Sequence, residues 1–174
     1  MARRATTGPR PYKYDKFVDR YFRRAGGLYA DAQRRFSQGR YPETVSAVQE
    51  ALELIVKGMF RAAGLDPPAR HQIDDRKFAE ELRRVREAVR TWYPRDDEWE
   101  DQRMGRIFFL ASFWAQAYIA AKYGSDVLDV GPSELFGRRE AALAVNHLGE
   151  VVMMFIRPIA KSKGAQEPQL PEVQ

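Results

Sequence analysis

Residues 39–57 read GRYPETVSAVQEALELIVK, and this stretch decides the expected fold because it sets three long polar side chains in an otherwise apolar helical pattern. Gln49, Glu53 and Lys57 follow one another at four-residue spacing, so they share one face of a helix. A glutamate four residues before a lysine is also the favourable order for an ion pair. Such a polar stripe either crosslinks a helical bundle or lines a binding site, and both interpretations stay open.

The composition is that of a globular protein that needs only one domain. The chain has 174 residues, of which 44% are hydrophobic and 30% charged. It has no cysteine, which excludes disulfides, thiolate metal sites and thiol catalysis. No apolar stretch follows the basic first residues, and the most apolar run, residues 107–121, is shorter than the roughly 20 residues that cross a bilayer. We therefore expect a cytoplasmic protein.

Apolar residues recur at three- and four-residue steps along most of the chain, and no segment alternates as a strand does. Short connections between the helical segments predict an all-α, antiparallel up-and-down bundle of about five helices. Gly39 and Gly64 should end the first two helices, and Gly26-Gly27 allows a kink or a break in the first. The expected helices are residues 14–38, 42–63, 74–91, 98–123 and 132–160. The helical domain is expected at 13–161, between a flexible basic tail at 1–12 and a flexible tail at 162–174.

The expected fourth helix is apolar on nearly all sides, since it carries Phe108, Phe109, Phe113, Trp114 and Tyr118. One neighbouring helix cannot cover such a surface. The helix is therefore either the centre of the bundle or a subunit interface, and we expect a homodimer.

Three blocks of sequence, in this order and spacing, resemble the HEPN family, a helical domain often found with minimal nucleotidyltransferases. They are Gly39-x-Tyr41 with the polar stripe and Gly64, the turn from Pro67 to Ile73, and Tyr118-Ile-Ala-Ala-Lys122-Tyr123-Gly124. The resemblance implies a module that binds a nucleotide, nucleic acid or a nucleotidyltransferase partner, with a toxin–antitoxin or defence context. The implied ligand-binding residues are Gln49, Glu53, Lys57, Arg70, His71, Tyr118, Lys122 and Tyr123.

Two departures from the family pattern bear on activity. Lys122 and Gly124 stand where the family usually has arginine and proline. Ribonuclease members resemble one another in an Arg-x4–6-His motif, whereas here Arg139 lies eight positions before His147. On a helix that spacing means a rotation of about 80° and a rise of about 12 Å, so the two side chains would not meet. We expect no catalytic residue and favour a non-catalytic binding module. A metal-independent ribonuclease and a structural adaptor are the alternatives.

Positive charge is concentrated near the start of the chain. Residues 1–40 hold eleven Lys/Arg and three Asp, while the remainder holds eighteen basic and twenty-one acidic residues. A basic stripe with tyrosines nearby is suited to gripping single-stranded nucleic acid by charge and stacking, although a solvated arginine-rich face would look the same. The nucleic-acid-binding candidates are Lys13, Lys16, Arg20, Arg23 and Arg24.

No cofactor or metal is expected. The acidic residues at 96–101 suit a helix N-terminus, where the dipole favours carboxylates without a cation. His71 either caps a helix or contacts a phosphate, and His147, on an apolar helix, is interpreted as a structural residue.

Overall fold

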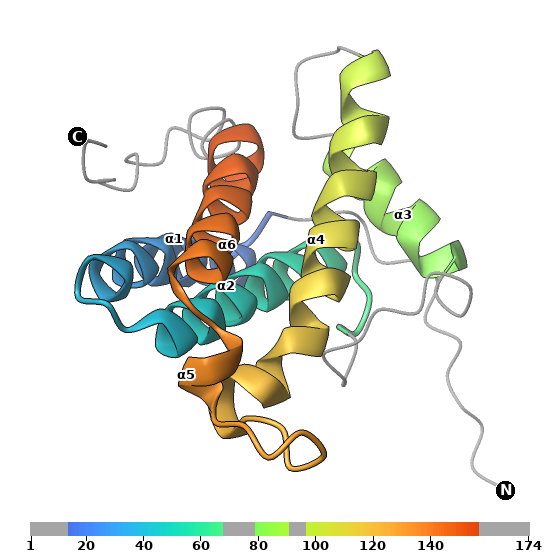
Figure 1. The fold of residues 1–174 in the computed structure, drawn as a ribbon. Helices are drawn as coiled ribbons and strands as arrows, with labels where there is room; N and C mark the ends of the chain where they lie inside the picture. Colours follow the sequence, from blue (N-terminus) through green and yellow to red (C-terminus); the bar gives the residue numbers. More distant parts are fainter. Residues whose placement is uncertain (1–13, 68–78, 91–96, 157–174) are drawn as a thin grey trace, which may run out of the picture.

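A computed structural model describes residues 14–67, 79–90 and 97–156 of the chain (Figure 1). Lys13, Arg70, His71 and both predicted tails lie outside the described residues. The described part holds no sheet, and its one isolated bridge pairs Ser125 with Val130. The helices are α1 (Lys16–Ser37), α2 (Tyr41–Ala62), α3 (Ala79–Arg90), α4 (Asp97–Tyr123), α5 (Pro132–Leu135) and α6 (Arg138–Val151), followed by a π-helical turn (Val152–Ile156). The predicted all-α class is confirmed.

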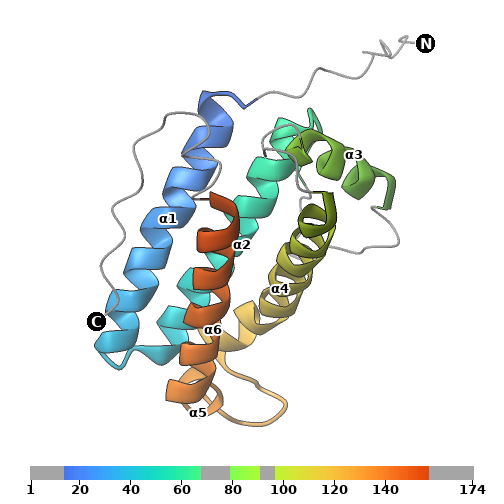
Figure 2. The same ribbon diagram turned by 90° about the horizontal axis from the view of Figure 1, so that it is seen from above.

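Helices α1, α2, α4 and α6 run alternately in opposite directions, which gives the predicted antiparallel up-and-down arrangement (Figure 2). Helix α2 is central, because it contacts α1, α4 and α6. Its buried side chains include Leu52, Ile55, Met59 and Phe60, each at most 1% exposed. The bundle is therefore built around the helix that carries the polar stripe.

The ends of the first two helices follow from local chemistry. Asp15 caps α1, since its Oδ1 accepts hydrogen bonds from the backbone N–H groups of Phe17 and Val18 at 2.9 and 3.1 Å. Gly39 and Gly64 have φ of 73° and 70°, a left-handed conformation that suits glycine after a helix end. The break that the sequence allows at Gly26-Gly27 does not occur, because α1 continues through both glycines.

The predicted single helix over residues 132–160 is wrong. The chain forms the short helix α5, passes through an extended residue at Phe136, and begins again as α6. Each start has its own cap: Glu134 accepts a hydrogen bond from the Gly131 N–H at 2.7 Å, and Glu140 accepts one from the Gly137 N–H at 3.0 Å. Residues 157–160 lie outside the described part.

Two glycines let α1 approach its neighbours closely. A Cβ atom added at Gly58 of α2 would lie 2.7 Å from the ring of Phe22, and one added at Gly149 of α6 would lie 2.8 Å from the Tyr29 hydroxyl. Phe22 is 2% exposed, and its ring meets the edge of Phe155 at a centroid distance of 5.6 Å. The ring at Gly58 therefore has little room to move.

The contact at Gly58 gives a stability prediction. We expect Gly58→Ala to lower the free energy of unfolding by about 1–2 kcal/mol, because overpacking outweighs the gain of up to about 1 kcal/mol in helix propensity. Gly27→Ala is the matched control: that position is exposed within α1, with no atom within 4 Å of an added Cβ, so alanine should stabilise. Urea unfolding of both variants tests this, and equal effects would contradict it.

Candidate functional site

The polar stripe of α2 forms a connected chain of side chains. Gln49 is 2% exposed, and its Nε2 donates to Glu53 Oε2 at 3.0 Å. The other carboxylate oxygen of Glu53 pairs with Lys57 Nζ. The Glu53 and Lys57 side chains are 18% and 30% exposed. The structure thus brings the three predicted residues together as a network, and their predicted role in ligand binding stays a prediction.

The predicted residues at the end of α4 form a second group. Lys122 Nζ donates to the Tyr118 hydroxyl at 3.4 Å and lies 5.6 and 5.3 Å from the ring centroids of Tyr118 and Tyr123. Contact with these two tyrosines, Tyr118 first, raises the pKa of Lys122. The end of α4 lies beside α5, at the opposite end of the bundle from the start of α1 (Figure 2). This group is therefore separate from the predicted basic stripe.

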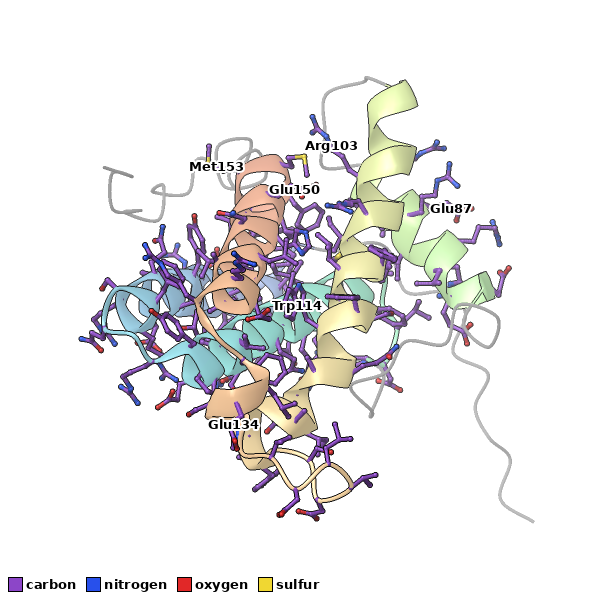
Figure 3. The ribbon with its side chains drawn as sticks, viewed as in Figure 1. Glu87, Arg103, Trp114, Glu134, Glu150 and Met153 are labelled. Carbon is purple, nitrogen blue, oxygen red and sulfur yellow. The ribbon has the colours of Figure 1, made fainter. Side chains whose placement is uncertain are left out.

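His147 of α6 faces α4 and has its Nδ1 occupied. The indole Nε1–H of Trp114 donates to this nitrogen at 3.2 Å, so a neutral His147 carries its proton on Nε2. Figure 3 shows Trp114 and Glu150 on the facing sides of α4 and α6. Partial burial lowers the pKa of His147, Arg106 lowers it further, and Glu150 opposes this. The imidazole is thereby favoured in its neutral form at pH 7.

The cation near His147 is Arg106, not Arg139. Arg106 makes a two-bonded ion pair with Glu150 across α4 and α6, at 3.0 and 3.1 Å, while Arg139 is exposed on α6. Sequence reasoning missed this neighbour, since 41 positions separate Arg106 from His147 and only the packing of α4 on α6 brings them together. The Arg106 guanidinium is already occupied by a carboxylate.

The basic stripe of α1 divides into paired and clustered cations. Arg23 Nε pairs with Asp19 at 2.6 Å, and Arg24 Nη2 pairs with Glu50 of α2 at 2.5 Å. These two predicted nucleic-acid contacts are therefore largely neutralised. Lys16 and Arg20 instead gather around an exposed aromatic ring.

That ring belongs to Phe17, which is 43% exposed. Lys16 Nζ lies 5.4 Å from its centroid, and the guanidinium carbons of Arg20 and Arg61 lie at 5.9 and 5.6 Å. Among the residues that the structure describes, no carboxylate pairs with Lys16, Arg20 or Arg61. We call Lys16, Phe17, Arg20 and Arg61 the cation cluster.

The cation cluster borders a cavity of about 260 Å³ between the first half of α1 and the second half of α2. Its walls combine aromatic and aliphatic side chains with guanidinium groups. The lining residues are Phe17, Arg20, Tyr21, Arg24, Leu54, Arg61 and Pro67. This cavity is the candidate functional site, because it joins apolar side chains to two guanidinium groups, Arg20 and Arg61, that have no carboxylate partner among the described residues.

Sequence reasoning found only part of this site. Arg20 and Arg24 are among the predicted nucleic-acid-binding residues, but Phe17 and Arg61 are not. A signal for Arg61 was present, since it stands four residues after Lys57 and so extends the four-residue spacing of the polar stripe. The sequence does not show how α1 packs against α2, and this packing is what brings Arg61 close to Phe17.

The described ranges 14–67, 79–90 and 97–156 contain no group of three or more His, Asp or Glu side chains placed to hold a metal ion. Within the same ranges, none of the helices is long and apolar enough to span a bilayer.

Comparison with known proteins defines the class of this chain. The family model for the HEPN domain matches residues 18–158, which is most of the chain, so the protein belongs to the HEPN family. No curated protein and no solved structure gave a match. The membership agrees with the helical bundle and confirms the resemblance seen in the sequence.

The polar stripe gives a prediction on stability. We expect Lys57→Met to cost about 1–3 kcal/mol of unfolding free energy, because it removes the cation that pairs with the mostly buried Glu53 carboxylate. Combining Glu53→Leu with Lys57→Met should cost less than Lys57→Met alone. Arg83→Met, which breaks the exposed ion pairs of Arg83 with Glu80 and Glu87 on α3, is the control and should cost under about 1 kcal/mol. Additive losses in a double-mutant cycle would show that Glu53 and Lys57 do not interact.

Proposed function

We propose that this HEPN protein is a non-catalytic module that binds single-stranded nucleic acid through the cavity between α1 and α2. The observation that carries the proposal is the cation cluster: three positive side chains lie within 6 Å of the centroid of one exposed ring, and no described carboxylate neutralises them. The family resemblance implies a nucleotide, nucleic acid or a nucleotidyltransferase as the partner. Of these, the phosphate backbone of a nucleic acid fits this chemistry best.

Electrostatics supports this choice of ligand. The three positive charges of the cation cluster repel one another. An exposed cation–π contact offsets this repulsion by only about 0.5–1 kcal/mol. A phosphate placed between Arg20 and Arg61 would replace that repulsion with attraction. Two arginines also offer planar pairs of N–H donors that match phosphate oxygens.

The contacts of His147 favour binding without cleavage. Its Nδ1 already accepts a hydrogen bond from Trp114, and the neighbouring Arg106 is paired with Glu150. A ribonuclease step would need a free base beside a cation that is available to the phosphate. The described surroundings of His147 offer a neutralised cation, so the ribonuclease alternative gains no support from them.

Assembly as a homodimer is part of the proposal. Helix α4 exposes Phe109 and Phe113 at 58% and 47%, with ring centroids 6.3 Å apart. Leu143 of α6 is 46% exposed, and Met153 of the π-helical turn that follows α6 is 50% exposed. Large apolar side chains on two neighbouring helices are characteristic of an interface. A nucleotidyltransferase partner would use the same kind of surface, but nothing in the described contacts favours it over a second copy.

The binding proposal predicts a steep salt dependence. We expect a fluorescently labelled single-stranded RNA to bind with a slope of about −0.7 in log affinity against log salt for each phosphate contact. Arg20→Glu combined with Arg61→Glu should weaken binding at least about tenfold and make the slope shallower by about 1.4, because two contacts are lost. Fluorescence anisotropy over a range of salt concentrations measures both.

Arg34→Glu and Arg40→Glu, made together, are the matched control. They change the net charge by the same amount, but they lie far from the cavity. Arg34 is in the last turn of α1 and pairs with Asp31, and Arg40 is the N-cap residue of α2 and pairs with Glu43. Their effect on RNA affinity should be small. Salt-insensitive binding, or equal losses in both double variants, would count against the proposed site.

The same samples, run on a gel, should contain intact RNA, and cleavage that disappears with His147→Ala would favour the ribonuclease.

The assembly proposal predicts a particle of twice the 20.1 kDa chain mass in light scattering at micromolar concentration. Phe113→Arg together with Leu143→Arg should yield monomers, since each change places a charge in the apolar contact. Wild-type protein that scatters as a single chain would contradict this prediction.

A further inference from the structure

We infer that the cavity between α1 and α2 takes one nucleotide unit, with its base against Phe17 and its phosphate between Arg20 and Arg61. This inference rests on the proposed function, and it adds recognition of the base to recognition of the charge. It distinguishes two kinds of site: one that merely attracts polyanions, and one in which an aromatic ring of the ligand is also bound.

The size of the cavity sets the first limit. Its volume of about 260 Å³ is slightly below the 300–1,000 Å³ that is usual for drug-sized ligands. Such a space suits a single base with its attached phosphate and leaves the rest of a strand outside. Leu54 and Pro67 are among the lining residues, and their apolar side chains fit the edge of a flat ring better than they fit a phosphate.

The exposed ring of Phe17 is the main argument. The face of an aromatic ring carries partial negative charge, so it attracts cations and repels a bare anion. A site for phosphate alone would gain nothing from a phenylalanine that lines it and is 43% exposed. A base, in contrast, stacks on an aromatic ring and on guanidinium planes alike. The combination of Phe17 with Arg20 and Arg61 therefore fits a ligand that has both a ring and a phosphate.

The positions of the cations agree with this arrangement. Arg20 lies on α1 and Arg61 on α2, and both approach the same ring, at 5.9 and 5.6 Å. A base at Phe17 would thus have cations from two helices beside it, within reach of the phosphate on the same nucleotide. Arg24 lines the same cavity but is held by Glu50, so we assign it no phosphate contact.

The experiment compares two ligands of equal charge: a short single-stranded RNA and an abasic phosphodiester strand of the same length. We expect the wild-type protein to bind the RNA about 5- to 150-fold more tightly than the abasic strand, the range expected for stacking of one base. Phe17→Leu should bring RNA affinity down to that of the abasic strand while leaving the salt slope unchanged. Phe17→Tyr should keep the preference for RNA.

Phe109→Leu is the matched control, since it also removes an exposed ring that has a guanidinium over it, at 6.0 Å from Arg106, and it keeps the α4 surface apolar. It should not change the ratio of the two affinities. Equal wild-type affinity for the two strands, or a ratio that survives Phe17→Leu, would overturn the inference and leave a site for phosphate alone. Failure of both strands to bind would instead overturn the proposed function itself. Because the wild-type comparison involves no substitution, a folding defect in one variant cannot obscure the result.

Discussion

The close approach of α1 to α2 at Gly58 is the constraint on which the rest of the structure depends. Phe22 fits there only because the opposing residue has no side chain, and the contact fixes how the two helices pair along their length. Phe17 lies five positions before Phe22, and Arg61 lies three positions after Gly58. A contact in the core therefore decides which surface side chains meet, and the candidate site exists because the helices cannot slide past one another.

The same pairing determines which cations stay available. Glu50 of α2 reaches Arg24 and neutralises it, while Asp19 does the same for Arg23 within α1. Among the cations of α1, only Lys16 and Arg20 in its first turns have no described carboxylate partner, since Arg34 and Arg35 also pair with Asp31. The number of basic residues near the chain start is therefore larger than the number of cations available for binding. Several of these residues form surface ion pairs, which contribute little to stability.

The features that depend on local chemistry could be predicted from the sequence. Glycines at positions 39 and 64 end two helices as expected, and the polar stripe predicted a face shared by Gln49, Glu53 and Lys57. Prediction failed where a side chain competes with the helix for backbone groups, as when Glu140 caps Gly137 and starts a new helix inside a continuous apolar pattern. It also failed where two helices supply one site, because Arg61 and Arg106 acquire their neighbours only through packing.

The left-handed turn at Gly124 sets how the chain leaves α4. Its φ is 80°, and an added Cβ would collide with the Val130 carbonyl oxygen at 2.3 Å. Proline, which the family pattern usually has at this position, is locked near −65° and cannot adopt this backbone. A proline at position 124 of this chain would therefore have to change the direction in which the backbone leaves α4. The course of the loop after α4 thus depends on one glycine, much as the pairing of α1 with α2 depends on Gly58.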